Sequence, residues 1–127
     1  MARRRGLVGG GRALIERGSV VMVHLQPTLG HEQRGLRPCV VVTDPEVLTA
    51  LRYPLIAVVP ITGRAGLGAL YPPLGEGVSG LRRPSWALAD QVRSVDKRHV
   101  QRLVGRVSEA ELAAIDQALA LYLGLSP

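Results

Sequence analysis

From Gly18 onwards, short runs of aliphatic and β-branched residues alternate with glycine and proline. The clearest runs are Ser19–Leu25, Arg37–Thr43 and Leu55–Thr62, and the second is dense in valine. Residues of this kind favour strands, and glycine and proline favour the turns between them. The pattern is typical of a small barrel or sandwich, so we expect a mainly β fold with Arg37–Thr43 as a central strand.

Further elements are predicted from local signals. A short strand is predicted near Ala69–Leu74, and another over Ser85–Ala89 that Gln91–Val95 continues beyond a turn or bulge. Asp44 and Pro45 predict a short helix through about Arg52, because aspartate caps a helix N-terminus and proline fits its first position.

The clearest helix is predicted near the C-terminus. Ser108 and Glu111 have the spacing of a capping box, and Gly124 lies where a helix stop is expected. Apolar residues recur between them at helical spacing, namely Leu112, Ile115, Leu119 and Tyr122. This stripe packs either on the barrel or on a second copy of the chain. Five strands and one strong helix make the expected fold mainly β (α+β).

The positive charge is concentrated at the N-terminus. The chain has a formal net charge of +6, and Met1–Ile15 contributes four arginines and no acid. The remainder has 12 basic and 10 acidic residues, a balance of +2. We interpret residues 1–15 as a flexible basic extension and residues 16–127 as one domain. The extension either adds non-specific phosphate affinity or only aids solubility.

Several classes of protein are excluded by what the sequence lacks. No run of about 20 apolar residues could span a membrane, and Met-Ala-Arg-Arg-Arg is not followed by the apolar segment of a signal peptide. We therefore expect a cytoplasmic protein. A single cysteine, Cys39, excludes an internal disulfide and a cysteine-cluster metal site. It lies in a valine run, so we expect a small buried hydrophobe.

The loop that joins the first two strands carries the most informative polar residues. Gln26–Pro38 contains two glycines, two prolines and several polar or charged side chains, and loops held by a rigid sheet often bear function. The three histidines, His24, His31 and His99, lack metal-ligand spacing, and no Gly-x-Ser-x-Gly or Gly-Lys-Ser motif is present. From composition alone, an ordinary solvated loop remains the alternative.

Four segments together resemble the MazF/PemK toxins. They are Glu16–Pro38, with Pro-Thr-x-Gly-His-Glu-Gln-x-Gly-x-Arg-Pro at its end, Val58–Thr62 (Val-Val-Pro-Ile-Thr), Asp90–Arg98 (Asp-Gln-Val-Arg-Ser-Val-Asp-Lys-Arg), and the helix Leu112–Leu125. Their order and spacing agree with the family over about Glu16–Leu125. The resemblance implies an SH3-like β-barrel of the MazF/CcdB kind, and a toxin of a toxin–antitoxin system that cleaves single-stranded RNA at short motifs without metal or cofactor.

The resemblance also implies which residues act. Arg37 and Thr62 match the catalytic pair, with Arg37 stabilising the charge that develops when a 2′-oxygen attacks phosphorus. Glu32 or His31 are the candidate bases, although Glu32 equally suits an ion pair that orients Arg37, and His31 an exposed or RNA-stacking ring. Residues expected to contact RNA are His31, Gln33, Gln91, Arg93 and Tyr71. Lys97 resembles a family residue but is interpreted as solvated.

Partners and alternatives follow from the same comparison. The resemblance implies a homodimer whose RNA groove follows the dimer interface, and an antitoxin whose acidic, partly disordered tail fills that groove. His24 and Gln26 stand where many relatives have acids, so we expect a less negative approach to the site and a different target preference. For Trp86 we favour a place in the core over a role in base stacking. Tyr71 is the better-exposed candidate for stacking. The alternatives are a CcdB-like gyrase inhibitor, which the C-terminal Gly-Leu-Ser-Pro disfavours, and a non-catalytic SH3-like nucleic-acid-binding module.

Overall fold

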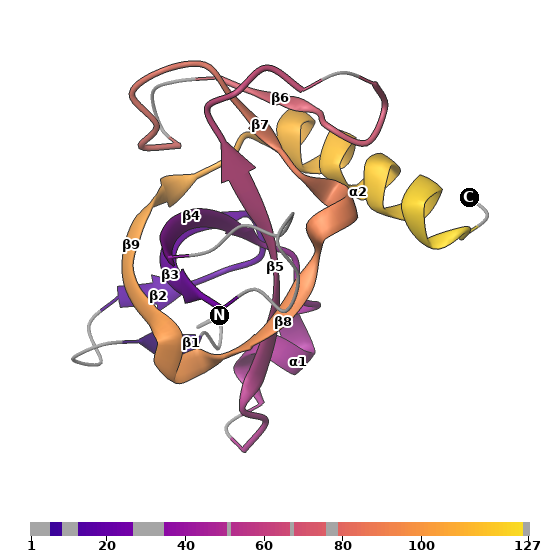
Figure 1. Cartoon of the computed structure of the whole chain (residues 1–127). Coiled ribbons are helices and arrows are strands. Elements are labelled where there is room, and N and C mark those ends of the chain that lie inside the picture. The colour runs from indigo at the N-terminus through magenta and orange to yellow at the C-terminus, as the bar shows by residue number, and fades with distance from the viewer. Residues whose placement is uncertain are drawn as a thin grey trace.

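Three antiparallel strands form the centre of the fold: β3 (Ser19–Leu25), β4 (Gly35–Val41) and β5 (Leu55–Thr62) (Figure 1). The computed structural model describes residues 6–8, 13–26, 35–50, 52–66, 68–75 and 79–125. The remaining elements are β1 (Gly6–Val8), β2 (Ala13–Ile15), α1 (Pro45–Thr49), β6 (Pro73–Leu74), β7 (Ser85–Ala87), the 3-10 helices η1 (Ala89–Gln91) and η2 (Lys97–His99), β8 (Arg93–Asp96), β9 (Val100–Arg106) and α2 (Glu109–Leu123).

The sheet branches at β5. Its strand order is β6-β7-β5-β4-β3-β9, and β8 pairs with β5 next to β7. β5 therefore has two partners along one edge: Leu55–Val58 pairs with β8, and Ile61–Thr62 pairs with β7. Figure 1 shows the resulting half-barrel, with β9 and β8 curving round the central strands. The predicted mainly β fold with a C-terminal helix is confirmed.

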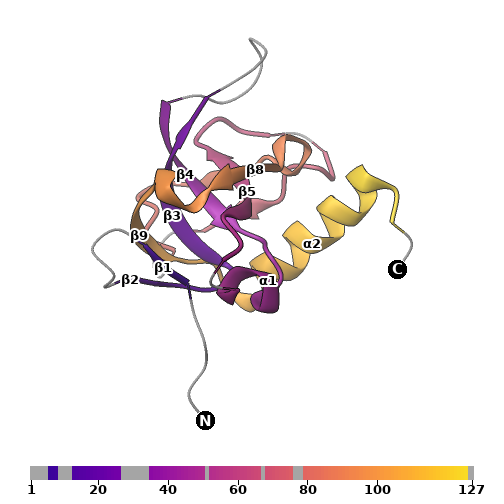
Figure 2. The same cartoon turned by 90° about the horizontal axis from the view of Figure 1, so that it is seen from below.

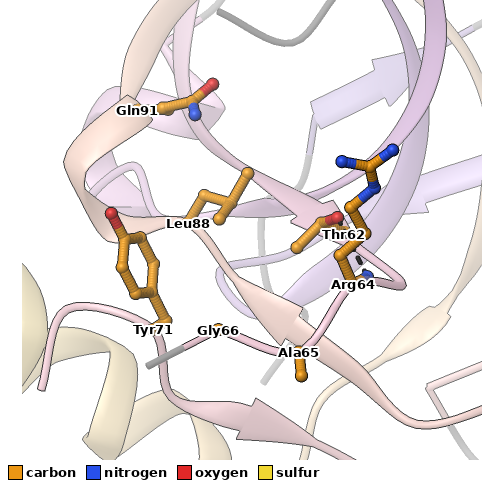
Figure 3. Close-up of a pocket in the computed structure, with 7 residues that line it drawn as sticks. All are labelled: Thr62, Arg64, Ala65, Gly66, Tyr71, Leu88 and Gln91. Atoms are coloured by element: carbon orange, nitrogen blue, oxygen red, sulfur yellow. Dashed lines mark hydrogen bonds between the residues drawn. The ribbon is translucent and has the colours of Figure 1, made fainter. Parts of the chain in front are cut away.

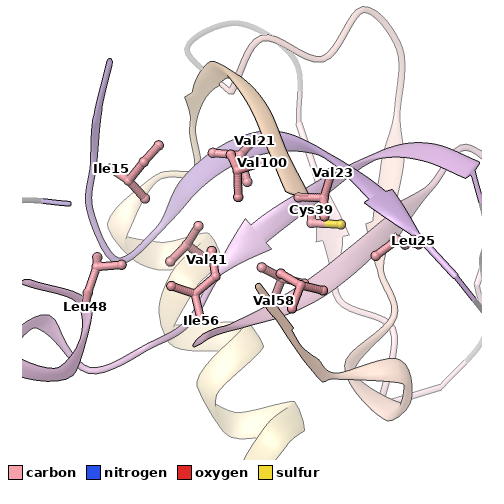
Figure 4. Close-up of a cluster of buried hydrophobic side chains, with 11 residues drawn as sticks. Ile15, Val21, Val23, Leu25, Cys39, Val41, Leu48, Ile56, Val58 and Val100 are labelled. Atoms are coloured by element: carbon pink, nitrogen blue, oxygen red, sulfur yellow. The ribbon is translucent and has the colours of Figure 1, made fainter. Parts of the chain in front are cut away.

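The central strands are buried on both faces. Successive side chains of a strand point to opposite faces, and here neighbouring valines enter different clusters. Val21, Val41 and Val58 belong to the cluster inside the curl (Figure 4), and Val20, Val40 and Val59 to the cluster outside it. All six side chains are 0% exposed. A sheet buried on both faces needs covering elements on both, which α1 and α2 supply.

Helix α2 covers the outer cluster. Ile115 is fully buried there, with Leu112 and Leu119 half-buried around it, and Figure 2 shows α2 lying along one side of the sheet. The capping box is formed as predicted: the Ser108 hydroxyl accepts from the Glu111 amide, and Glu111 accepts from the Ser108 amide. Gly124 ends the helix in the left-handed conformation that glycine favours.

Glu111 has a second role. While one carboxylate oxygen accepts from Ser108, the other accepts a 2.6 Å hydrogen bond from the backbone amide of Gly75, directly after β6. The first turn of α2 is thereby connected to the loop region that precedes β7. Of the predicted stripe, Leu112, Ile115 and Leu119 pack on the sheet, whereas Tyr122 is exposed.

Two strands have the predicted bounds, and one is displaced. β3 and β5 match the predicted ranges residue for residue. β4 begins and ends two residues earlier than predicted. At its predicted end, the Thr43 hydroxyl takes the place of a backbone partner, because it accepts from the Ala57 amide at 2.6 Å. A side chain here continues the strand pairing that the backbone has ended.

The edge strand β9 was not predicted. β9 pairs with β3 at the sheet edge, and its register shifts twice, between Val20 and Val21 and between Met22 and Val23. These bulges break the alternation of buried and exposed residues that reveals a strand in a sequence. Gln101, Arg102 and Leu103 are consecutive exposed residues within it.

The N-terminal segment predicted as an extension contains structure. β1 and β2 pair as an antiparallel hairpin, and Ile15 is 1% exposed within the inner cluster. The packed part of the chain therefore includes residue 15, one position before the predicted domain start. The expectation of a flexible extension rested on the glycines and arginines of Met1–Ile15. The apolar residues Leu14 and Ile15 at its end indicate packing instead.

The short helix and its surroundings agree in part with prediction. Asp44 caps α1 by accepting from the Glu46 amide, but the helix ends at Thr49 and does not reach Arg52. Lys97, interpreted as solvated, donates instead to the carbonyls of Leu48 and Ala50. A cation near the last carbonyls of a helix is stabilising. No helix in the described residues is both long and apolar enough to cross a membrane.

Cys39 is fully buried in the inner cluster, as predicted (Figure 4). Burial raises the pKa of its thiol to about 12, although the nearby charge of Arg93 acts in the opposite direction. We expect the native protein not to react with a thiol reagent at pH 8, and to react fully once denatured, because the thiolate is the reactive form. The raised pKa also favours the folded state only at lower pH, and this contribution is lost as the pH rises from about 9 to about 12. Rapid labelling of the native protein would contradict the assignment.

Candidate active site

The strand register brings Arg37 and Thr62 to the same end of the sheet. The ladder between β4 and β5 ends at the pair Cys39 and Pro60. Arg37 lies two residues before Cys39, and Thr62 lies two residues after Pro60, so both point to the same face as that pair. Continued in the same register, the two strands would set Arg37 opposite Thr62. Arg37 is exposed and Thr62 half-buried, as expected at a rim.

Arg93 joins this end of the sheet from a third strand. It begins β8, where it pairs with Val58 of β5. Its guanidinium donates a 2.5 Å hydrogen bond to the carbonyl of Gln26, the first residue after β3. β3 ends, β4 begins, β5 ends and β8 begins at the same rim, because each is antiparallel to its neighbour. The predicted residues Arg37, Thr62 and Arg93 therefore share one end of the sheet.

A pocket of about 410 Å³ opens beside Thr62 (Figure 3). Its lining residues are Thr62, Arg64, Ala65, Gly66, Tyr71, Leu88 and Gln91. Tyr71 and Gln91 lie on one side, Thr62 and Arg64 on the other, and Leu88 between them. Three residues that were predicted separately, Thr62, Tyr71 and Gln91, thus line one cavity.

Thr62 is positioned by the turn that follows β5. Its hydroxyl oxygen accepts a 3.2 Å hydrogen bond from the Arg64 amide, an arrangement common where Thr begins a turn. The bond uses the oxygen as an acceptor and does not consume the hydroxyl proton. Thr62 also pairs through its backbone with Trp86 of β7, so the hydroxyl is held from both strand and turn.

Tyr71 is less free than its predicted role implied. It is half-buried, and its hydroxyl donates a 2.6 Å hydrogen bond to Asp90 Oδ2. This bond, together with desolvation and the charge of Asp90, raises the pKa of Tyr71 above its usual value. Trp86 is half-buried on β7.

Arginines that the sequence did not single out lie beside Thr62. Arg64 lines the pocket. A Cβ atom built on Gly63 would lie 3.1 Å from the guanidinium of Arg83, which places that side chain next to the turn after Thr62. Only the spacing of Arg64, two residues after Thr62, offered a local signal, and Arg83 is brought in from a distant loop.

Other predicted site residues lie outside the described part of the chain. They are Glu32, His31 and Gln33, all in the loop between β3 and β4. Among residues 13–26, 35–50 and the later described segments, no group of three or more His, Cys, Asp or Glu gathers as a metal site would.

The described arrangement suits a phosphodiester next to a flat ring. Guanidinium groups donate paired hydrogen bonds to phosphate oxygens, and Arg37, Arg93 and the Thr62 hydroxyl lie at one rim. The adjoining pocket combines an aromatic face with an amide that can both donate and accept. Such a site has the donors for an anion and the apolar walls for a base.

Comparison with known proteins supports this interpretation. Residues 16–123 match the family model described as PemK-like, MazF-like toxin of type II toxin–antitoxin system. The chain is 37% identical over 118 residues to the curated Endoribonuclease MazF9 of Mycobacterium tuberculosis, covering 88% of this chain and 98% of that protein.

Solved structures show the same architecture. MazF from Deinococcus radiodurans superposes with a TM-score of 0.72 at 26% identity, covering 87% of this chain and 96% of that one. A MazE–MazF structure from the same organism gives a TM-score of 0.68 at 27% identity, covering 88% and 97%.

Proposed function

This chain belongs to the PemK-like, MazF-like toxin family of type II toxin–antitoxin systems, and on that premise we propose that it cleaves single-stranded RNA at a short recurring sequence without a metal ion. Family membership and the similarity to a curated endoribonuclease make it an endoribonuclease toxin of a toxin–antitoxin system. The products would carry 5′-hydroxyl ends.

The observation that carries the mechanism is the matched position of Arg37 and Thr62. Both lie two residues beyond the last pair of the β4–β5 ladder and on the same face. Continued in that register, this pair of strands would hold a guanidinium and a hydroxyl at neighbouring places. Pro38 restricts the backbone next to Arg37, which helps to maintain the direction of that side chain.

The reaction is an internal transfer at phosphorus. The 2′-oxygen of one ribose attacks the adjacent phosphorus, the bond to the 5′-oxygen of the next nucleotide breaks, and a 2′,3′-cyclic phosphate and a 5′-hydroxyl result. Negative charge grows on the phosphoryl oxygens and on the leaving oxygen. Arg37 would donate to those oxygens, and Thr62 would donate its hydroxyl to the phosphate. One preorganised donor of this kind is worth about 3–4 kcal/mol of transition-state stabilisation.

The proton of the 2′-hydroxyl needs an acceptor. Arginine stays protonated in proteins. Arg37 is therefore better suited to stabilise the charge on the phosphoryl oxygens and to donate a proton to the leaving oxygen than to act as the base. Glu32 is the proposed base, with His31 as the alternative, on the strength of the family motif between β3 and β4. The residues proposed to contact RNA are His31, Gln33, Gln91, Arg93 and Tyr71.

An acidic partner fits the same rim. Arg64 and Arg83 lie beside Thr62 and the turn after it, and Arg37 and Arg93 lie on strands that reach the same rim. The MazF of the 27% identical structure was solved together with MazE. We propose that the antitoxin of this chain places an acidic, partly disordered tail across these arginines, and so blocks the phosphate site. Opposite charges of this kind also speed association.

Arg37→Ala is expected to reduce RNA cleavage at least about 100-fold, since one donor contributes that much to the rate. The measurement is the single-turnover rate on a long unstructured RNA with mapped cleavage ends. Arg98→Ala is the matched control, because it removes the same charge from an exposed side chain beyond the opposite end of β8. Equal rates for wild type and Arg37→Ala would refute the assignment. Inert wild-type protein would favour the gyrase-inhibitor or binding-module alternative.

Cleavage is expected to continue unchanged in EDTA and to leave 5′-hydroxyl ends. A 5′-hydroxyl end accepts phosphate from a polynucleotide kinase without prior phosphatase treatment, which gives a direct readout. Inhibition by EDTA that Mg²⁺ reverses, or 5′-phosphate ends, would contradict the proposed chemistry.

A homodimer is expected in solution, with twice the 13.6 kDa mass of the chain. The end of α2 and the residues directly after it expose several large apolar side chains, Leu121, Tyr122, Leu123 and Leu125, and grouped exposed apolar residues mark interfaces. Light scattering at micromolar concentration measures the mass. A monomeric mass there would count against a dimeric RNA groove.

A further inference from the structure

A partly buried hydrogen bond lies beside the pocket next to Thr62. It joins Tyr71, in the segment before β6, to Asp90 of η1. The other oxygen of Asp90, Oδ1, is buried and has no hydrogen-bond partner among the described residues. A buried carboxylate is costly unless its oxygens find donors. Among the described residues, the Tyr71 hydroxyl is the side-chain group that donates to Asp90.

The ring of Tyr71 is held on its other side by the turn after β5. A Cβ atom on Gly66 would lie 2.6 Å from the Tyr71 Cβ and 3.1 Å from its Cγ, so a larger residue at position 66 would displace the ring or the turn. Glycine is required here by close approach, not by an unusual backbone angle.

The backbone on either side of Tyr71 is fixed as well. The Leu70 carbonyl accepts from the Ala89 amide at 3.1 Å, and the Pro72 carbonyl accepts from the Ala87 amide at 3.0 Å. Tyr71 therefore forms a fixed wall of the pocket. A wall that is ordered before binding loses little entropy when a ligand arrives.

Other residues of the pocket supply its polar groups. Gln91 follows Asp90 directly and presents an amide, and Thr62 belongs both to this pocket and to the proposed phosphate site. A volume of about 410 Å³ is ample for one base. A base that enters beside Thr62 must belong to a nucleotide adjacent to the cleaved bond.

We propose that this pocket binds one unstacked nucleobase next to the scissile phosphate, against the ring of Tyr71 and the amide of Gln91, and that Asp90 is a positioning residue that acts through Tyr71. This inference rests on the proposed ribonuclease function. It assigns recognition of one position of the RNA to the segments around β6 and η1. Stacking of a base on an aromatic ring accounts for about a five- to hundredfold gain in affinity.

The test uses short RNAs that contain the mapped cleavage motif, with each base near the cut replaced in turn and with an abasic nucleotide at each of those positions. Tyr71→Leu removes the ring, and Tyr71→Phe keeps the ring but removes the hydroxyl. At one position, Tyr71→Leu is expected to lower kcat/KM on the preferred base about ten- to hundredfold, mainly through KM. On the RNA that is abasic at that position, it is expected to match the wild type.

Asp90 is tested by a double-mutant cycle. Asp90→Ala alone is expected to weaken base discrimination at the same position, and to add nothing in the Tyr71→Phe background, because its action passes through the hydroxyl. Equal losses by Tyr71→Leu on every RNA, the abasic one included, would overturn the pocket assignment. A further loss from Asp90→Ala in the Tyr71→Phe background would overturn the positioning role.

Binding separates this inference from the proposed function. In the Arg37→Ala background, an RNA carrying 2-aminopurine at successive positions reports stacking as a change in fluorescence without cleavage. One position is expected to respond, and to lose its response on Tyr71→Leu. A response that persists in this variant would refute the pocket even if the wild type cleaves RNA. A wild type that cleaves no RNA would refute the function, and the fluorescence would still decide where a base binds.

Discussion

The fold depends on three strands that are buried on both faces. In β3, β4 and β5, adjacent valines such as Val20 and Val21 enter different clusters, so neither face is left for solvent. Both faces then need cover, which the curl of the sheet with α1 supplies on the inside and α2 on the outside. Polar side chains are excluded from the middle of these strands and find room only where the strands end. The clustering of Arg37, Thr62 and Arg93 at one rim follows from this burial.

Local signals in the sequence predicted a good part of this arrangement. Ser19–Leu25 and Leu55–Thr62 had the observed bounds because apolar runs end there at polar or glycine-rich segments, and Ser108, Glu111 and Gly124 marked the ends of α2. β9 was not predicted, because its register shifts twice at the sheet edge and its residues do not alternate regularly between buried and exposed. Arg37 and Thr62 were identified by family resemblance, and the register supports their pairing. The contact between Tyr71 and Asp90, and the approach of Arg83 to Gly63, join irregular segments far apart in the chain, where no periodicity exists to read.

The site divides its work between two kinds of structure. Regular strands hold the groups proposed to act on the phosphate, since Arg37 lies on β4 and Thr62 ends β5. Irregular segments supply most of the pocket, through Tyr71, Leu88 and Gln91. Thr62 lies at the junction and belongs to both. Cleavage at phosphorus needs the same arrangement of groups for every substrate, which paired strands can provide. Recognition of a base depends instead on which side chains the turns and short helices carry.

The hydrogen bonds that attach residues 70–75, which include Tyr71 of the proposed base pocket, have a consequence for the evolution of this segment. Gly75 is held by Glu111 through its backbone amide, and Leu70 and Pro72 are held through their carbonyls. These attachments use main-chain groups that nearly every amino acid provides, apart from the missing amide of proline. The side chains between these positions are therefore not needed to attach the segment to the sheet and α2. A lineage can exchange them, and with them the base that the proposed pocket would accept, while the backbone hydrogen bonds are retained.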